Sequence, residues 1–342
     1  MIKEINKVGI VGAGKMGTGI FNYLMDFGFE LTLVSSPGSD VDKINRQFDK
    51  KIRRSLDAGI INPARFELLE RTVISRDLNS LSDCDLIIEA LPELKTLKRE
   101  LLSSLDKCIK EDAIFATNSS SFNPSELSPP GHRVFTTVGL HFFYPVQLKN
   151  IVELTVTSRT FDETILVIES FLDRINRRHI KLGEDCSFIL NRIMLDVQNE
   201  AFLFVDAGRC TYRQMDQMVK ENLFPFGIFD FFDSVGLDTM LTSVKNYTRS
   251  YPRYFHYEPL INVLDDLVSK GRLGVRTQAG FYDYPLEIVP VKDSYYKEQI
   301  IQQLREVWIE SAGNFATAAN ISPEDANFAI REYFDIPAWP PG

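Results

Sequence analysis

The sequence predicts an α/β domain with a doubly wound, mostly parallel sheet, followed by an all-helical domain. Short apolar runs alternate with helical patterns in the first half, and such alternation is typical of a parallel sheet covered on both faces. From Ser187 onward, amphipathic helix patterns follow with few strand signals. We therefore expect residues 1–185 to form the sheet domain, 186–285 a helical domain, and 286–342 a partial repeat of that helical domain.

The elements of the sheet domain can be placed in order along the chain. Residues 7–11 are a short apolar run broken by glycine, which predicts a buried parallel strand. A helical pattern follows and ends near Gly28, and residues 40–70 form a second, polar and basic helical stretch. Further strands are predicted at residues 30–36, 72–75, 86–91, 113–118, 134–143 and 177–185.

Two segments of the helical half share a pattern. Residues 199–227 and 309–342 each pass from an amphipathic helix through a Ser/Thr start signal and a second helix to a Pro-x-Gly ending. We interpret this as an internal repeat. Chance similarity between two helical hairpins is the alternative.

Composition and charge exclude several classes of function. The net charge of −9 argues against a general nucleic-acid-binding surface. No run approaches the about 20 apolar residues of a membrane helix, and the start has no signal-peptide pattern. The four cysteines form no CxxC pair and none lies near a histidine at metal-ligand spacing. We expect reduced cysteines, no metal site, no membrane partner and a cytoplasmic location.

A glycine-rich loop, GAGKMG, follows the first strand and opens the first helix. Gly12, Gly14 and Gly17 have the G-x-G-x-x-G spacing. The first glycine allows the tight turn, the second lets the backbone approach a pyrophosphate, and the third allows close helix–strand packing. The loop, with Lys15 and Met16 between its glycines, predicts a Rossmann-type domain that binds NAD or NADP. A glycine-rich turn in some other α/β protein is the alternative.

The end of the second strand differs from the usual pattern. A carboxylate usually lies there and binds the adenosine ribose hydroxyls, whereas this chain has Ser35 and Ser36. Serine would not repel a 2′-phosphate, yet no Arg or Lys follows until Lys43, so nothing adjacent would bind that phosphate. We therefore expect NAD rather than NADP, with weaker discrimination than Asp would give.

One histidine carries the chemical hypothesis. His141 lies at the end of a predicted strand, at the edge where open α/β folds bind ligands, and Glu153 follows twelve residues later. Alcohol oxidation needs a base that titrates near neutral pH, and imidazole is the natural choice. A carboxylate on the other ring nitrogen would fix the tautomer. A core histidine with one satisfied hydrogen bond is the alternative.

Several stretches together resemble the L-3-hydroxyacyl-CoA dehydrogenase family, in the family's order and over about residues 7–285. They are KVGIVGAGKMGTGI, DLIIEALPELKTLK, ATNSSS, GLHFFYPVQLKNIVEL, SFILNR, DSVGLDT and GRLGVRTQAGFYDY. The resemblance is to the short-chain-length, monofunctional type. The second copy of the repeat resembles the extra half-domain carried by some longer members.

The resemblance implies a role for several residues. His141 would take the proton of the substrate's 3-hydroxyl as hydride leaves for the nicotinamide, and Glu153 would hold the imidazole. Ser120 and Asn191 would hydrogen-bond the reacting oxygen. Because Asn191 opens the helical domain, the site would be a cleft between domains. The implied cofactor contacts are Glu93 and Lys98 near the ribose and Asn118 by the nicotinamide.

These residues also have ordinary structural interpretations. Ser120 lies in a serine-rich turn, where serine is common as a helix cap, and Asn191 could cap the start of a helix. Glu93 could be a solvated acid at a helix N-terminus. Lys98 could be a surface lysine.

The chain departs from the family pattern where the substrate would bind. The usual HFFNP is HFFYP here, which places Tyr144 where a small amide would contact the substrate region. Residues 42–55 carry six cations, among them Lys50 and Arg54, and in the family this region forms a helical arm beside the CoA phosphates. We expect a docking surface for CoA or for an acidic acyl carrier protein. A solvated helix face is the alternative.

The sequence thus predicts an NAD-dependent dehydrogenase of a 3-hydroxyacyl thioester, bound to CoA or to an acyl carrier protein. The resemblance implies a homodimer, and fatty acid metabolism or a specialised biosynthetic route. Two other functions remain open: oxidation of a free hydroxy acid of the sugar-acid or carnitine type, and a non-catalytic NAD-binding or structural role. The retained HFF and the basic arm favour thioesters.

Overall fold

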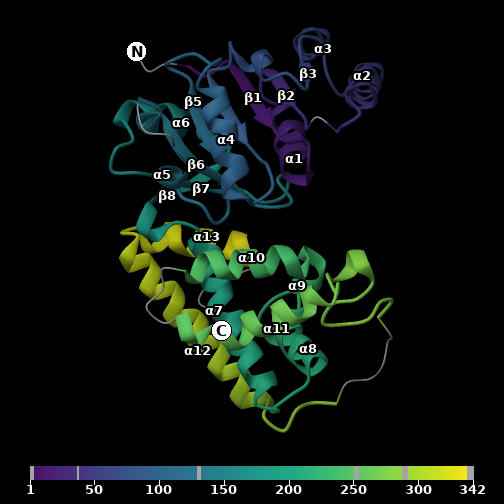
Figure 1. The fold of residues 1–342 in the computed structure, drawn as a ribbon, viewed down its shortest axis with the longest axis vertical. Coiled ribbons are helices and arrows are strands. Elements are labelled where there is room, and N and C mark those ends of the chain that lie inside the picture. The colour runs from purple at the N-terminus through teal and green to yellow at the C-terminus, as the bar shows by residue number, and fades with distance from the viewer. Residues whose placement is uncertain (1–3, 37, 129–131, 250–253, 287–291, 337–342) are drawn as a thin grey trace. The chain divides into compact units, whose positions relative to one another are not determined.

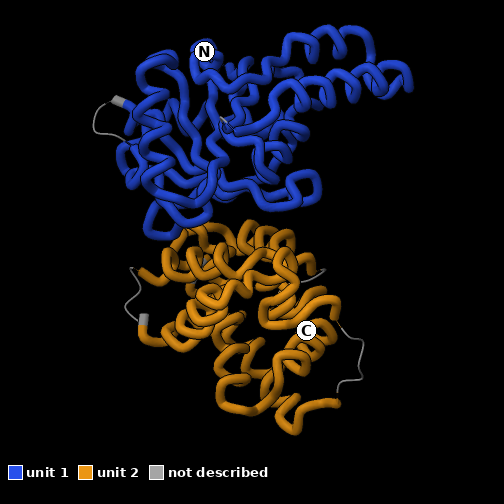
Figure 2. The backbone as a smooth tube through the Cα atoms, turned by 45° about the vertical axis from the view of Figure 1, so that its right-hand side comes forward, with its two compact units in different colours: residues 1–187 blue, residues 188–342 orange. Residues whose placement is uncertain are grey.

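The computed structural model divides the chain into two compact units, which Figure 2 shows in different colours. Unit 1 is Met1–Ser187 and unit 2 is Phe188–Gly342. The residues that the structure describes are 4–36, 38–128, 132–249, 254–286 and 292–336.

Unit 1 is built on an eight-stranded sheet with the order β3-β2-β1-β4-β5-β6-β7-β8 (Figure 1). The strands are β1 (Lys7–Val11), β2 (Glu30–Val34), β3 (Val73–Ser75), β4 (Leu86–Glu89), β5 (Ile114–Thr117), β6 (Thr137–Phe142), β7 (Ile151–Val156) and β8 (Arg178–Gly183). All neighbours pair in parallel except β6 and β7, which are antiparallel. The predicted Rossmann-type sheet domain is confirmed. Its winding reverses between β1 and β4, the switch point at which open sheets bind ligands.

Helices connect most of these strands. They are α1 (Lys15–Leu24), α2 (Val41–Asp57), α3 (Pro63–Glu70), α4 (Lys95–Leu105), α5 (Pro124–Leu127) and α6 (Asp162–Arg174). Asp40 and Asn62 begin α2 and α3, because each side chain accepts a backbone N–H of the first helical turn. In Figures 1 and 2 these two helices extend away from the rest of unit 1 as an arm.

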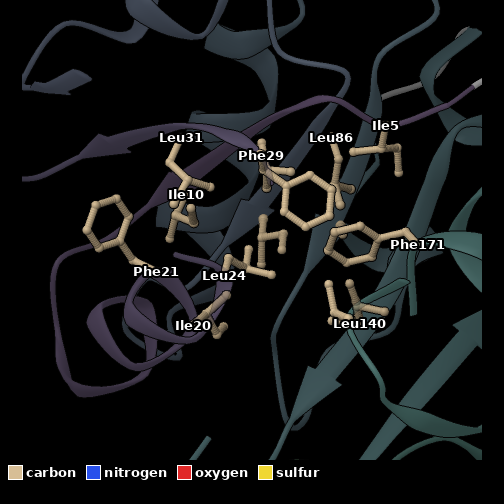
Figure 3. Packing of buried hydrophobic residues seen from close by; sticks show 14 of the residues in the cluster. Ile5, Ile10, Ile20, Phe21, Leu24, Phe29, Leu31, Leu86, Leu140 and Phe171 are labelled. Atoms are coloured by element: carbon tan, nitrogen blue, oxygen red, sulfur yellow. The ribbon is translucent and has the colours of Figure 1, made fainter. Parts of the chain in front are cut away.

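Two apolar clusters lie on opposite faces of the sheet. Leu86 and Ile88 belong to one cluster and Ile87 between them belongs to the other, as the alternation of side chains along a strand requires. Figure 3 shows part of the larger cluster, in which Phe29 and Phe171 pack beside the strand residues. Burying each such side chain contributes about 1.5–3 kcal/mol. This packing fixes the strands whose carboxyl ends carry the predicted site residues.

The strand predictions need two corrections. The strand predicted at 134–143 begins only at Thr137, because His132–Phe135 form a short 3-10 helix. Arg133 in this turn is buried, and its guanidinium donates to the carbonyls of three residues, Lys110, Glu111 and Ala113. In addition, β7 was not predicted, although its sequence IVELTV is rich in residues that favour strands.

Several predicted strands end earlier than expected. The sheet pairing of β4 stops at Glu89, that of β5 at Thr117 and that of β8 at Gly183. The residues that follow lie in turns, and several predicted site residues belong to these turns.

The described part of unit 2 is helical, apart from isolated bridges at Gly274, Ala279 and Asp283, which confirms the predicted helical domain. Its longer helices are α7 (Ile189–Asp206), α8 (Tyr212–Asn222), α9 (Ile228–Val235), α10 (Leu237–Thr248), α11 (Glu258–Ser269), α12 (Lys297–Ala318) and α13 (Pro323–Phe334). The segment after residue 285 therefore contributes α12 and α13 to this unit.

The two segments interpreted as a repeat have similar local structure. Thr211 accepts the backbone N–H of Gln214 at the start of α8, and Ser322 accepts that of Asp325 at the start of α13. Each short helix follows a longer one, α7 or α12. The Pro-x-Gly ending of the second segment, residues 340–342, lies outside the described residues. The repeat itself stays a prediction.

The remaining predictions concern the cysteines, membrane helices, the cellular location and the oligomeric state. The four cysteines are free. Among the described helices, none combines the length and the apolar character that crossing a bilayer requires. The cytoplasmic location and the homodimer stay predictions.

Candidate active site

His141 and Glu153 lie opposite each other in the sheet, because the antiparallel register of β6 and β7 pairs these two residues. Directly opposed side chains of an antiparallel pair lie on the same face. Nδ1 of His141 is 2.8 Å from Oε2 of Glu153. Glu153 is fully buried, and His141 is 6% exposed. The chain turns back between β6 and β7, and the residue twelve positions after His141 therefore lies opposite it.

This contact sets the chemistry of the imidazole. An ionised carboxylate only accepts hydrogen bonds, so a carboxylate at Nδ1 keeps the ring proton on that nitrogen. In the neutral ring, Nε2 is then the nitrogen that accepts a proton. The arrangement is the one that a general base requires.

The serine-rich turn after β5 is organised around the carboxylate of Glu93. Oε1 accepts the backbone N–H groups of Ser120 and Ser121 at 3.1 and 2.9 Å. It also accepts the hydroxyls of Ser121 and Ser119. Burial alone would raise the pKa of Glu93, but Lys98 and these two hydroxyls hold that pKa below its ordinary value. Glu93 is therefore not a solvated acid.

Lys98 is 1% exposed, so the interpretation as a surface lysine is wrong. Its Nζ lies 2.8 Å from Oε1 of Glu89, 3.2 Å from Oε2 of Glu93 and 3.2 Å from the carbonyl oxygen of Leu91. Three acceptors match the three N–H bonds of an ammonium group. This geometry gives Lys98 the role of holding Glu93, and its place near the cofactor ribose stays a prediction.

Glu89 is the residue of this cluster that the sequence reasoning missed. It is fully buried at the end of β4, and it accepts the hydroxyl of Thr117 at 2.6 Å and the backbone N–H of Leu91 at 2.5 Å. Glu89 and Thr117 are also register partners on β4 and β5. A carboxylate that closes the apolar run LIIE was the available signal.

Ser120 and Asn118 lie at the carboxyl end of β5. The N-cap of α5 is Asn123, so the helix-cap interpretation of Ser120 is wrong. Among the described residues, the Ser120 hydroxyl has no hydrogen-bond partner. Oδ1 of Asn118 accepts the backbone N–H of Phe142 at 2.8 Å. This bond ties the turn after β5 to the residue beside His141.

Two glycines of the glycine-rich loop are required by the fold, whereas the third leaves open space. A Cβ on Gly12 would lie 2.6 Å from the carbonyl oxygen of Ala90, and a Cβ on Gly17 would lie 1.7 Å from that of Gly12. The fold itself therefore requires these two glycines. A Cβ on Gly14 would meet nothing within 4 Å, so space is open at the start of α1, where Lys15 is exposed and Met16 is half-buried.

Ser35 follows β2 and is 4% exposed. Its Oγ is buried without a hydrogen-bond partner among the described residues. An unsatisfied buried hydroxyl costs about 1–3 kcal/mol, and a hydroxyl of an adenosine ribose would satisfy it. The open space at Gly14 and the unsatisfied Ser35 hydroxyl both fit a bound dinucleotide.

Asn191 is the third residue of α7, in unit 2. Its Nδ2 donates to the hydroxyl of Tyr247 at 2.8 Å, and the hydroxyl of Tyr333 donates to its Oδ1 at 2.8 Å. The N-cap of α7 is Phe188, so the capping interpretation of Asn191 is wrong. The cleft between the domains stays a prediction.

Two of the six cations of the basic arm have partners within the protein. Lys51 donates to Oδ1 of Asn22 at 2.7 Å, and Arg53 lies 3.6 Å from a carboxylate oxygen of Glu70. The other four are exposed and have no protein partner among the described residues, and we call them the arm surface: Lys43, Arg46, Lys50 and Arg54. Tyr144 is 60% exposed, and its contact with a substrate stays a prediction.

The sequence matches two family models. Residues 7–186 match the model described as "3-hydroxyacyl-CoA dehydrogenase, NAD binding domain", and residues 188–284 match "3-hydroxyacyl-CoA dehydrogenase, C-terminal domain". The chain belongs to the 3-hydroxyacyl-CoA dehydrogenase family. The predictions of this family, of an NAD-dependent enzyme of its type and of NAD as the cofactor are thereby confirmed.

Relatives of this family resemble the chain over most of their own length. A 3-hydroxybutyryl-CoA dehydrogenase of Clostridioides difficile is 30% identical over 281 residues, covering 81% of this chain and 99% of the relative. One of Bradyrhizobium diazoefficiens is 32% identical over 290 residues, covering 83% and 97%. The crystal structure of (S)-3-hydroxybutyryl-CoA dehydrogenase from Ralstonia eutropha has a TM-score of 0.71 at 29% identity and covers 83% and 100%.

A solved structure from Escherichia coli, also a 3-hydroxybutyryl-CoA dehydrogenase, covers 98% of this chain and 90% of its own. Its TM-score is 0.82, but the sequence identity is 18%. At this identity it shows that the fold is shared, and no more.

Ser35→Ala should separate the stability of the protein from its affinity for the cofactor. Removal of a buried, unsatisfied hydroxyl should leave the unliganded protein at least as stable, while the loss of one ribose hydrogen bond weakens NADH binding up to about tenfold. Thermal unfolding and NADH titration measure the two effects. Ser36→Ala removes an exposed hydroxyl and should change neither quantity. A less stable variant that binds NADH normally would contradict the assignment of Ser35.

Lys98→Met should destabilise the protein in a pH-dependent way. In the wild type, the lowered pKa of Glu93 means that its stabilising contribution is present above the ordinary value of 4.5 and is lost as the pH falls. Without the ammonium group, burial raises the pKa of this carboxyl, so the variant loses stability as the pH rises from about 4 to about 7. Near neutral pH the difference should reach about 3–5 kcal/mol.

Urea unfolding of both proteins across this pH range measures the effect. Lys95→Met is the matched control on the same helix, because Lys95 makes a half-exposed pair with Glu126. That control should cost at most about 1 kcal/mol. A Lys98→Met penalty that stays constant with pH would show that the lysine does not compensate buried carboxylates.

Proposed function

We propose that the chain catalyses the reversible oxidation of the 3-hydroxyl group of an acyl thioester, with NAD as hydride acceptor and His141 as the general base. The observation that carries this proposal is the 2.8 Å contact between Nδ1 of His141 and Oε2 of Glu153. It lies at the end of β6, in a domain whose family binds NAD. The relatives named as 3-hydroxybutyryl-CoA dehydrogenases support the class of substrate.

Bound NAD supplies the acceptor for the hydride that leaves the carbon bearing the hydroxyl group. Nε2 of His141 takes the proton of that hydroxyl, and Glu153 stabilises the resulting imidazolium in a site that excludes water. The Ser120 hydroxyl and the Asn191 amide hydrogen-bond the same oxygen and hold it beside the imidazole. In the reverse direction, His141 returns the proton as the carbonyl oxygen becomes a hydroxyl.

The arm surface supports a thioester that carries phosphate groups. Lys43, Arg46, Lys50 and Arg54 are exposed cations without protein partners in the described chain, on a protein whose net charge is −9. Lysine and arginine bind phosphate through charge-assisted hydrogen bonds. The phosphates of CoA fit this surface, and so does the acidic surface of an acyl carrier protein. Turnover of matched CoA and carrier-protein thioesters distinguishes the two.

His141→Gln should lower kcat for NADH-dependent reduction of acetoacetyl-CoA by about 10²–10⁴-fold, because the proton donor and acceptor is lost. Glu153→Gln should lower it by about 10–100-fold, since the ring loses the carboxylate that orients it. NADH affinity should be unchanged in both variants. Steady-state kinetics and NADH titration measure these quantities. His179→Gln is the control, because His179 lies 3.8 Å from Glu169 in a second histidine–glutamate pair.

Three outcomes would contradict the proposed function, each in a different way. Equal loss of turnover and NADH binding in His141→Gln would mean that the histidine serves folding. A wild type that binds NADH but reduces no 3-ketoacyl thioester would favour the non-catalytic alternative. Turnover of free hydroxy acids in place of thioesters would replace the proposed substrate class.

A further inference from the structure

Two tyrosines hydrogen-bond the side-chain amide of Asn191. Only one of them lies in the part of the chain that the C-terminal family model matches. Tyr247 in α10 lies within residues 188–284, which the C-terminal family model matches. Tyr333 in α13 lies beyond that model. The Clostridioides difficile relative is matched over 99% of its length by 81% of this chain. The rest of this chain therefore has no counterpart in that relative.

Together, the two hydroxyls bind the amide in one of its two orientations. A primary amide presents either its carbonyl oxygen or its N–H groups to a ligand, depending on a half-turn about its last bond. The Tyr333 hydroxyl takes the carbonyl oxygen at 2.8 Å, and the Tyr247 hydroxyl takes one N–H at 2.8 Å. Within the described part of the chain, the second N–H of Asn191 has no acceptor. A hydrogen-bond donor therefore remains for a ligand.

Buried contacts hold α12 and α13 in place. Phe334, next to Tyr333, is fully buried, and its ring centroid lies 5.0 Å from that of Phe224 and 4.9 Å from that of Trp308. Ser311 of α12 donates to the carboxylate of Asp196, five residues beyond Asn191 on α7. These contacts fix α13 against the helix that carries Asn191, so the Tyr333 hydroxyl has a defined position.

We propose that Tyr333 is a positioning residue for the reaction, supplied by a segment that shorter relatives lack. By binding the carbonyl oxygen of Asn191, it leaves the amide N–H as the group that faces the reacting oxygen. A donor stabilises the negative charge that develops on this oxygen, whereas a carbonyl in its place would repel that charge. The proposal rests on the role of Asn191 in the proposed function.

Tyr333→Phe removes only the hydroxyl and keeps the ring. For NADH-dependent reduction of acetoacetyl-CoA, kcat should fall about tenfold, the loss of about one hydrogen bond, with little change in KM or NADH affinity. Tyr295→Phe is the matched control, because this tyrosine of the same segment is 91% exposed. It should behave as the wild type does. Thermal unfolding followed by tryptophan fluorescence verifies that each variant is folded.

A double-mutant cycle with Asn191→Ala tests whether Tyr333 acts through Asn191. In the Asn191→Ala background, Tyr333→Phe should have no further effect on kcat, because the amide that it orients is gone. An unchanged kcat in Tyr333→Phe, or the same loss in both backgrounds, would overturn the proposal. A wild type without turnover would overturn it together with the proposed function. Failure of the proposed function is distinguishable from failure of the Tyr333 proposal alone, because the wild type then also lacks turnover.

Discussion

The site depends first on the hydrogen bond between Nδ1 of His141 and Oε2 of Glu153. The bond exists because β7 runs antiparallel to β6 in a sheet that is otherwise parallel. Antiparallel neighbours can be joined by a short connection, whereas a parallel neighbour needs a crossover of a dozen or more residues. The reversal therefore brings a carboxylate back onto the imidazole twelve residues later and buries it fully.

A second buried polar cluster supports the neighbouring strands. Lys98 joins Glu89 at the end of β4 to Glu93 in the following turn, and Glu93 in turn organises the backbone around Ser120. Buried charges are costly unless each has its partners, so the three groups are stable only together. Asn118 then connects this region to β6 beside His141. The carboxyl edge of the sheet is thus held in place by side-chain bonds as well as by packing.

The parts of this site that the sequence predicted are those that rest on local patterns. The glycine loop has a fixed spacing, and the spacing of His141 and Glu153 is set by one hairpin. Burial of Lys98 was not predictable, because lysine is usually exposed and its partners become neighbours only through β4 and the turn after it. The contact between Tyr333 and Asn191 spans 142 positions, so no local pattern indicates it. Strand β7 was missed although it has six residues, because the turn before it contains no glycine.

The most direct test of the central interaction is the protonation pattern of the His141 ring. Imidazole ¹⁵N chemical shifts would be recorded for the four histidines, with the His141 signals assigned by their loss in His141→Gln. The structure predicts that the neutral ring carries its proton on Nδ1, and that Nε2 is the nitrogen that changes as the ring takes up a proton. A neutral ring protonated at Nε2, with Nδ1 accepting a hydrogen bond from Glu153, would contradict the proposed mechanism.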